Sequence, residues 1–234
     1  VADPPACRFD PAVLACKGED NDLCLTPKQV ELTRRVYRGI EDPSSKRILP
    51  GLFPGAEADP GNWDFWLLRS PTKPLGGKKP APGSAPPTSI NESFFRHLVR
   101  ADDAFSLADL TDADLIEARR RWSDTLDATN PDLRAFRDRG GKLLHYHGWT
   151  DSAISPVFSL NYLAAVQNKV GDTAGFYRLF MVPGLNHCGG GAGPWQVDWL
   201  GALERWVEAG EAPASLTARH PGSGATQVLR PVTK

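Results

Sequence analysis

The second half of the chain alternates between strand-like and helix-like segments, and this alternation constrains the fold more than any other feature. After Asn130-Pro131, a glycine turn leads into residues 140–148, an apolar segment typical of a strand in a buried parallel sheet. A helix begins at Ser155-Pro156, a second strand covers residues 176–182, and a last helix runs from about 195 to 209. Strand, helix, strand and helix in this order predict an α/β fold with parallel strands and a right-handed connection.

The first half of the chain has a different pattern, in which short helices are joined by long loops. Thr26-Pro27-Lys28-Gln29 is a capping box with proline at the first helical position, so a helix is expected to begin at Thr26. Helical patterns return at residues 91–100 and 111–127, whereas residues 42–89 are dense in Pro and Gly. We therefore divide the chain into a loop-rich, mainly helical domain over residues 1–130 and an α/β domain over residues 131–234.

The cysteines are unevenly spaced, which indicates the compartment. Cys7, Cys16 and Cys24 lie close together, whereas Cys188 stands alone. A polar, turn-rich loop separates Cys16 from Cys24, and a disulfide closing it indicates a secreted or periplasmic protein. A zinc site is the alternative, but no His lies near these cysteines. Cys7 and Cys188 could pair with each other or with residues outside this chain.

Charge and hydropathy exclude two classes of partner. The net charge is −1 and the basic residues are scattered, so the cationic patch that nucleic acid or an acidic membrane surface requires is not expected. The longest apolar stretches are shorter than the ~20 residues that span a bilayer.

Two titratable residues follow the two predicted strands. Asp151 comes shortly after the first strand and His187 shortly after the second. Function in α/β sheets gathers at the carboxyl ends of the strands, and an Asp followed by a later His matches the last two members of the Ser…Asp…His order of α/β-hydrolases. The alternatives are that Asp151 is a helix-capping or turn residue and that His187 is a surface loop residue.

The motifs around these residues resemble one family. His147-Gly148-Trp149-Thr150-Asp151, followed by Met181-Val182-Pro183-Gly184-Leu185-Asn186-His187-Cys188-Gly189-Gly190-Gly191, is similar to the tannase and feruloyl esterase family, which includes monohydroxyethyl terephthalate hydrolase. The Cys7-Arg8-Phe9-Asp10-Pro11 stretch, with Cys16 and Cys24-Leu25-Thr26-Pro27, resembles the lid domain of the same family. The resemblance covers nearly the whole chain and implies an α/β-hydrolase core preceded by a lid, here residues 1–130.

The resemblance also implies roles for individual residues. Asp151 becomes the acid and His187 the base of a catalytic triad, and Cys188 becomes half of a bridge to a cysteine beside the nucleophile. Cys16 and Cys24 match a lid disulfide, and Cys7 matches a cysteine whose partner lies upstream, beside a structural calcium loop. The family's nucleophilic serine turn, oxyanion-hole donors and calcium ligands belong to sequence before Val1. No cofactor is expected for catalysis.

Other candidate residues lie near the predicted site. Ala153 and Ile154 follow the acid and are expected to line the pocket, and Trp63 and Trp66 could either cover an aromatic substrate or simply pack. No metal is assigned in this chain, because His145 and His147 share a strand face but have no evident third ligand. Ser223 comes closest to a replacement nucleophile, but it follows the last helix and lies outside any strand-to-helix turn, so we expect it to lie in a turn of a flexible tail.

The predicted function is hydrolysis of aromatic acid esters such as feruloyl or galloyl esters, with this chain supplying the lid, Asp151 and His187. Alone, the chain is expected to be inactive because it lacks the nucleophile. Two alternatives stay open. One is an accessory or processed fragment attached to an N-terminal remainder through disulfides, and the other is a different α/β enzyme, such as a lyase or a haloalkane-type hydrolase, that uses the same pair.

Overall fold

The computed structural model describes residues 4–41, 47–67 and 90–233, which fall into two compact units. One unit combines Val1–Leu68 with Pro131–Lys234, and the other is Arg69–Asn130. The predicted boundary near residue 130 coincides with the end of the smaller unit, but residues before position 69 are grouped with the α/β segment. The assignment of residues 1–130 to a lid concerns a role in catalysis and stays a prediction.

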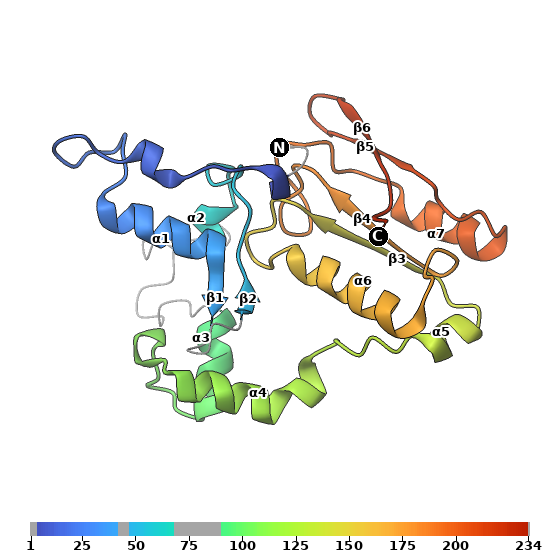
Figure 1. Cartoon of the computed structure of the whole chain (residues 1–234), viewed down its shortest axis with the longest axis horizontal. Coiled ribbons are helices and arrows are strands. Elements are labelled where there is room, and N and C mark those ends of the chain that lie inside the picture. Colours follow the sequence, from blue (N-terminus) through green and yellow to red (C-terminus); the bar gives the residue numbers. More distant parts are fainter. Residues whose placement is uncertain (1–3, 42–46, 68–89, 234) are drawn as a thin grey trace, which may run out of the picture. The chain divides into compact units, whose positions relative to one another are not determined.

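The larger unit contains the strands and most of the helices (Figure 1). In chain order its elements are η1 (Pro4–Ala6), η2 (Pro11–Leu14), α1 (Pro27–Arg38), β1 (Gly39–Glu41), β2 (Arg47–Pro50), α2 (Trp63–Trp66), α5 (Arg134–Asp138), β3 (Leu143–Gly148), α6 (Val157–Val170), β4 (Tyr177–Val182), α7 (Trp199–Glu208), β5 (Leu216–Arg219) and β6 (Thr226–Leu229). The smaller unit consists of α3 (Ile90–Phe94), which continues into the π-helical turn η4 (Phe95–Arg100), then η5 (Leu107–Asp109) and α4 (Asp112–Leu126).

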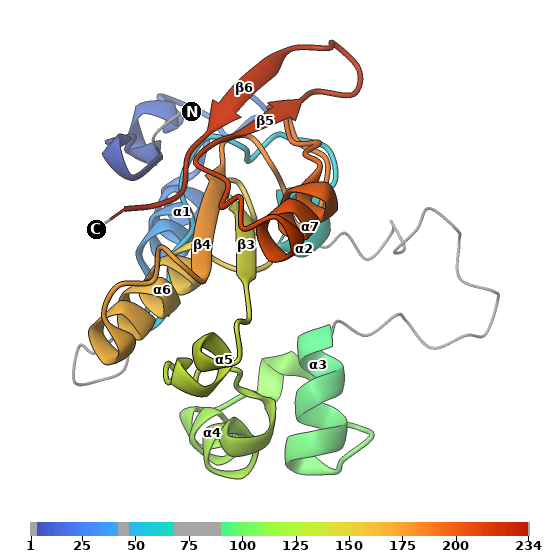
Figure 2. The same ribbon diagram turned by 90° about the vertical axis from the view of Figure 1, so that its right-hand side faces the viewer.

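The predicted strand, helix and strand unit is confirmed. β3 and β4 pair in parallel over their full lengths, from Leu143 opposite Tyr177 to Gly148 opposite Val182. Helix α6 connects them, and in Figure 2 it lies on one side of the strand pair while α7 lies on the other. Because the strands are parallel, their carboxyl ends meet at one edge, where the loops after Gly148 and Val182 emerge together.

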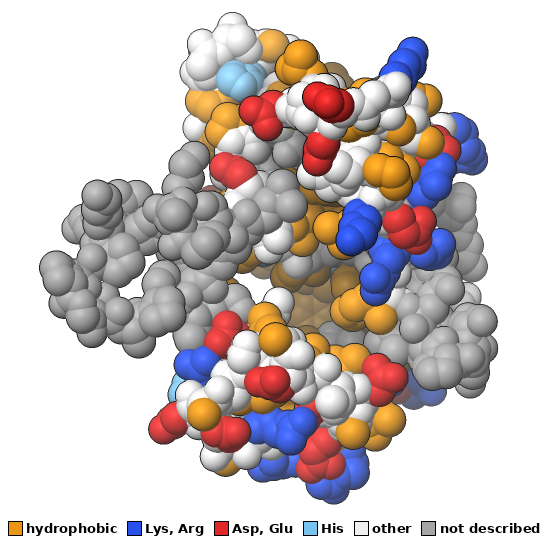
Figure 3. Space-filling model, turned by 90° about the vertical axis from the view of Figure 1, so that its left-hand side faces the viewer, with side chains coloured by type: hydrophobic (Ala, Val, Ile, Leu, Met, Phe, Trp, Pro, Cys, Tyr) orange, Lys and Arg blue, Asp and Glu red, His pale blue; other side chains and the backbone are white. Residues whose placement is uncertain are grey.

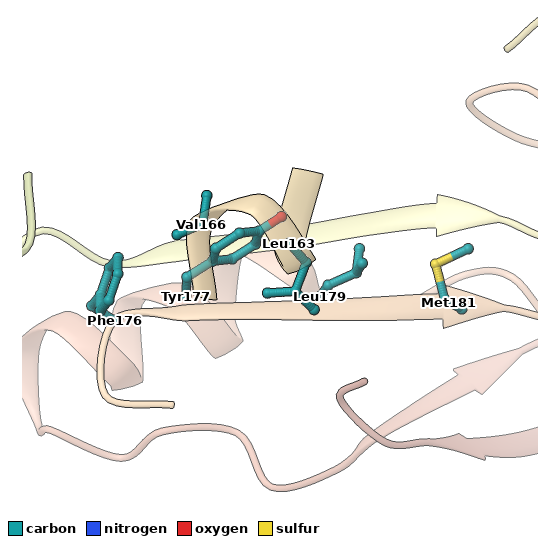
Figure 4. Packing of buried hydrophobic residues seen from close by; sticks show 6 residues of the cluster. All are labelled: Leu163, Val166, Phe176, Tyr177, Leu179 and Met181. Carbon is teal, nitrogen blue, oxygen red and sulfur yellow. The ribbon is translucent and has the colours of Figure 1, made fainter. Parts of the chain in front are cut away.

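Alternate residues of β4 bury its two faces in different cores, as the pleat of a strand requires. Tyr177, Leu179 and Met181 project toward α6 and form one core with residues of that helix (Figure 4). Phe180 and Val182 project to the opposite face. The buried members are Leu163, Val166, Phe176, Tyr177, Leu179 and Met181 in the first core, and Phe180, Val182, Leu185, Ala218 and Leu229 in the second.

The capping patterns in the sequence mark real helix starts. The Thr26 hydroxyl accepts a hydrogen bond from the Gln29 N–H at 3.2 Å, and the Gln29 side chain accepts one from the Thr26 N–H at 2.7 Å. This capping box places the start of α1 where it was predicted. Helix α4 likewise begins directly after Thr111, which forms a capping box with Asp114.

Two predictions about the C-terminal segment are wrong. The last helix begins at Trp199 and not at Trp195, because the backbone of Gln196 pairs with Arg219 and the Asp198 side chain then caps the helix. The residues after this helix are not a flexible tail, since β5 and β6 form an antiparallel hairpin. Ser223 lies in the turn of that hairpin, outside any strand-to-helix turn.

The described part of the Pro- and Gly-rich segment contains the short elements β2 and α2. β2 pairs with β1, and Trp63–Trp66 form the short helix α2. The glycine and proline run at positions 76–83 lies outside the described residues.

The Cys16–Cys24 disulfide is confirmed, and it closes a loop with a sequence separation of 8. Cys7 is a half-buried free thiol and Cys188 an exposed one.

On the side drawn in Figure 3, Lys and Arg side chains gather over part of the surface, with acidic and apolar side chains beside them. Among residues 4–41, 47–67 and 90–233, no helix is long and apolar enough to cross a membrane.

Candidate active site

The structure brings the carboxyl group of Asp151 and the imidazole of His187 together at the shared carboxyl edge of β3 and β4. Nδ1 of His187 lies 2.9 Å from Oδ2 of Asp151. The other carboxylate oxygen, Oδ1, accepts hydrogen bonds from the N–H groups of Ala153 at 2.9 Å and Ile154 at 2.8 Å. Asp151 is 6% exposed, whereas the His187 side chain keeps 25% of its surface. A buried carboxylate therefore holds an imidazole that solvent can still reach.

Backbone contacts between the two loops fix this arrangement. The Thr150 N–H donates to the Leu185 carbonyl at 3.2 Å, and the Thr150 hydroxyl lies 2.7 Å from the same carbonyl and 2.8 Å from the Asn186 side-chain oxygen. Gly148, at the end of β3, is needed because a Cβ there would overlap the Leu185 carbonyl. The loop carrying Asp151 is thus attached to the residues directly before His187.

Asn62 joins a third segment to these loops, and sequence reasoning missed it. Its side-chain amide is 1% exposed and donates to the carbonyls of Ala56 at 2.9 Å and Thr150 at 3.1 Å. The same nitrogen lies 3.3 Å from the Asn186 side-chain oxygen, and the Ser152 hydroxyl donates to the Asn62 oxygen. No sequence signal could reveal this, because the partners of Asn62 in the two loops are 88 to 124 residues away.

The environment of Asp151 favours its ionised form. Burial opposes ionisation, but hydrogen bonds from two imidazoles and a backbone N–H outweigh it and hold the pKa of the Asp151 carboxyl below its ordinary value. The carboxylate is therefore charged at neutral pH and can orient the His187 imidazole and stabilise its protonated form.

The second imidazole on Asp151 belongs to His147. Nε2 of His147 lies 3.2 Å from the same Oδ2 that His187 contacts. Nδ1 of His147 lies 2.6 Å from the Ser159 hydroxyl, which is in turn 3.1 Å from Nε2 of His145. The prediction that His145 and His147 share a strand face anticipated part of this cluster, but the sequence did not indicate Ser159 as their common partner.

Of the two predicted aromatic residues, only Trp66 has its ring beside that of His187. Its ring centroid is 4.8 Å from that of His187, with the planes at 75°. Trp63 is buried and packs 5.9 Å from the Tyr37 ring, so it offers little surface to a ligand. Ala153 is half-buried and Ile154 is 49% exposed, which leaves the Ile154 side chain open to solvent beside the acid.

Cys188 follows the base directly and adopts a left-handed backbone conformation, with φ of 61°. Its free thiol lines a pocket of about 320 Å³ together with Tyr146, Leu185, Trp195, Gln196, Val197 and Trp199. Cys7 lines a different pocket of about 350 Å³. Within the described ranges, neither thiol contacts another cysteine, so the predicted bridges to residues outside this chain stay predictions.

Metal binding was expected only upstream of this chain. The described part of the chain holds no group of three or more His, Cys, Asp or Glu side chains arranged to bind a metal ion. The structural calcium remains an expectation from the family resemblance.

Comparison with known proteins gives consistent results. The profile of the family described as "Tannase and feruloyl esterase" matches residues 1–232. The chain is 32% identical to a probable feruloyl esterase of Arthroderma benhamiae, over 98% of this chain and 43% of that protein. It is 31% identical to the mono(2-hydroxyethyl) terephthalate hydrolase of Piscinibacter sakaiensis, over 92% of this chain and 39% of that protein.

A solved structure also matches nearly the whole of this chain. Feruloyl esterase B from Aspergillus oryzae superposes with a TM-score of 0.80 at 23% identity, covering 98% of this chain and 47% of that one. The chain thus spans less than half the length of the relatives that it matches.

Proposed function

The chain belongs to the tannase and feruloyl esterase family, and from this premise we propose that it supplies the acid and the base of a serine esterase acting on aromatic acid esters. Its parallel strand pair with flanking helices is part of an α/β-hydrolase fold. The single observation that carries the proposal is the 2.9 Å contact between Asp151 and His187 at the carboxyl ends of adjacent parallel strands.

We assign a separate role to each ring nitrogen of His187. Nδ1 faces the buried carboxylate and carries the proton of that hydrogen bond. In the described parts of the chain, no side chain hydrogen-bonds to Nε2, which is the atom that a base needs to leave accessible. Nε2 can therefore accept the proton of a nucleophilic hydroxyl group while Asp151 stabilises the resulting imidazolium.

The reaction then follows the double displacement of serine esterases. The hydroxyl oxygen attacks the ester carbonyl as its proton passes to Nε2, and the same proton is returned to the departing alcohol. Water repeats the sequence on the acyl-enzyme, so that the aromatic acid is released and the serine is regenerated.

We place the nucleophile outside this chain. Ser152 and Ser155 lie in the turn between β3 and α6, but each is only 4% exposed and already donates a hydrogen bond, Ser152 to the Asn62 side chain and Ser155 to the Gly51 carbonyl. Ser223 lies in a hairpin turn. The N-terminal remainder of the same enzyme would supply the serine and the oxyanion hole, and the chain alone would be inactive.

The aromatic preference rests on the ring beside the base. Trp66 lies edge-on to His187, where it can contact an aryl group placed at the acyl carbon. Ile154, whose side chain is exposed, donates its backbone N–H to Oδ1 of Asp151. The disulfide supports a secreted or periplasmic location.

The test uses the full-length protein that contains this chain. Methyl ferulate and methyl butanoate serve as aryl and aliphatic esters, and a fluorophosphonate probe labels the nucleophile. We expect faster turnover of the aryl ester and a single labelled serine outside residues 1–234. Absence of both turnover and labelling, or labelling of a serine within this chain, would overturn the proposal.

The alternative of a non-catalytic fragment follows from the free thiols of Cys7 and Cys188. Mass spectrometry of unreduced protein from its natural source distinguishes the two, since a peptide bridged to Cys188 indicates a two-part enzyme. A free thiol at Cys188 in an isolated chain without esterase activity would favour the fragment.

A further inference from the structure

We propose that His147 is a positioning residue for the catalytic acid: it supplies the fourth hydrogen bond to the Asp151 carboxylate and limits the negative charge that Asp151 presents to His187. This inference rests on the proposed function, because it gives His147 a role in the same site. It starts from the observation that one buried oxygen, Oδ2, is shared by two imidazoles, at 2.9 Å and 3.2 Å.

The coordination of the carboxylate is complete. Oδ1 accepts from two backbone N–H groups, and Oδ2 accepts from His147 and His187. An ionised carboxylate has about four lone-pair sites, so all of them are used. Rotation of the carboxylate would break several of these bonds inside a buried site, and its orientation is therefore fixed.

The proton positions on His147 follow from its neighbours. Nε2 faces the Ile154 carbonyl at 3.1 Å as well as the Asp151 carboxylate, and both are acceptors, so Nε2 must carry a proton. In the neutral ring Nδ1 is then an acceptor, and it receives the Ser159 hydroxyl proton at 2.6 Å.

The remaining hydrogen bonds of the cluster also have their donors pointing toward Asp151. The Ser159 oxygen accepts from Nε2 of His145 at 3.1 Å, and Nδ1 of His145 accepts from the Tyr177 hydroxyl at 2.9 Å. Desolvation is the main cause that lowers the pKa of His145 to about 4, which keeps it neutral with one donor and one acceptor. Every member thus donates toward Asp151.

The turn after β3 presents Asp151 and the Ile154 carbonyl to His147, and α6 presents Ser159. The neighbouring strand β4 places Met181 opposite His147 in the strand register. The other titratable groups of the cluster are His145 and Tyr177, which act through Ser159, and His187, which acts through Asp151.

Ser159, His147 and Asp151 also resemble a nucleophile, base and acid in series, but the arrangement does not suit attack on an ester. Ser159 is 7% exposed and lies within helix α6. Its hydroxyl is already hydrogen-bonded to two imidazoles. Ser159 and His147 therefore act on Asp151 through hydrogen bonds, and a substrate has no access to the Ser159 hydroxyl.

The first experiment measures pH profiles of kcat/KM for the full-length enzyme with methyl ferulate. His147→Phe removes the donor, His147→Gln replaces it with an amide N–H, and His97→Phe is the control, since His97 lies in the other unit and is exposed. In His147→Phe we expect the acidic limb to move upward by about half a pH unit to one pH unit, because Asp151 then presents more charge to His187.

We expect kcat for His147→Phe to fall roughly tenfold, as for a lost positioning contact, while KM stays within about twofold. His147→Gln should recover most of both effects. An unmoved acidic limb in a folded His147→Phe enzyme, or a His147→Gln enzyme no better than His147→Phe, would overturn the proposal.

The second experiment does not depend on esterase activity. Nitrogen-15 NMR of the histidine rings at neutral pH is expected to show His147 protonated at Nε2. A proton on Nδ1 alone would refute the inference even if the enzyme is active. The expected tautomer in a protein without esterase activity would instead count against the proposed function.

Discussion

Replacement of Asp151 by Asn should stop the base from accepting a proton, although the fold stays unchanged. The two side chains have nearly the same shape, so the effect depends on which end of the amide faces His187. The N–H groups of Ala153 and Ile154 hold the Oδ1 position and require an acceptor there. The oxygen of the introduced amide must therefore take that position, and its NH₂ group must face Nδ1 of His187.

The consequence is the wrong tautomer of the base. With an N–H donor in front of it, Nδ1 of His187 becomes an acceptor, and the neutral ring carries its proton on Nε2. Nε2 can then no longer accept the proton of the nucleophile. The same change in serine proteases lowers kcat by roughly 10⁴-fold, and we expect a loss of this size here.

The assay compares kcat and KM of the full-length enzyme, its Asp151→Asn variant and an Asp124→Asn control with methyl ferulate. Asp124 is exposed and lies in α4 of the other unit. We expect KM to change little, because the lost interaction acts on proton transfer. A loss smaller than about tenfold in a folded variant, or a loss carried mainly by KM, would refute the reasoning from tautomers.

Three further changes test parts of the structure. Gly148→Ala should abolish activity and lower the melting temperature, because its Cβ would overlap the backbone carbonyl of Leu185; both are measured on the same preparation. Replacing Cys16 and Cys24 together by Ser should lower the free energy of unfolding by about 2.5 kcal/mol in urea titrations, as the chain-entropy relation gives for a short loop. In urea titrations at several pH values, the wild type should lose stability relative to Asp151→Asn as the pH falls below 3.8, since the carboxyl has a lowered pKa and its stabilising charge is lost on protonation.

Each of these predictions has a contrary outcome. Gly175→Ala is the matched control for Gly148→Ala, because a Cβ at Gly175 meets no atom within 4 Å. Equal behaviour of the two alanine variants would contradict the close approach of the loops. An unchanged unfolding midpoint without the disulfide, or a pH-independent difference between wild type and Asp151→Asn, would contradict the other two.

Local patterns predicted the elements that hold the site. Capping at Thr26 and the apolar runs of β3 and β4 depend on near neighbours, so they are visible in the sequence. The hairpin of β5 and β6 was missed because its strands have four residues each and its turn is rich in Pro and Gly. Trp195 was assigned to the last helix on spacing, but the pairing of Gln196 with Arg219 takes precedence.

The parts of the site that depend on contacts between distant segments could not be predicted from the sequence. The order of Asp151 and His187 in the chain was informative because parallel strands bring their carboxyl ends to one edge. The roles of Asn62 and Ser159 were not visible, because each depends on how distant segments pack. His147 was placed on the correct strand, but its contact with Asp151 requires the turn that follows.

The central claim is that Asp151 and His187 act as one unit, and a double-mutant cycle on the full-length enzyme tests it most directly. It compares kcat/KM of Asp151→Asn, His187→Gln and the double variant with methyl ferulate. Residues that act as a unit are not additive, so the double variant should be no slower than the slower single variant, within about threefold. Losses that multiply in the double variant would show that the two residues act independently and would contradict the account.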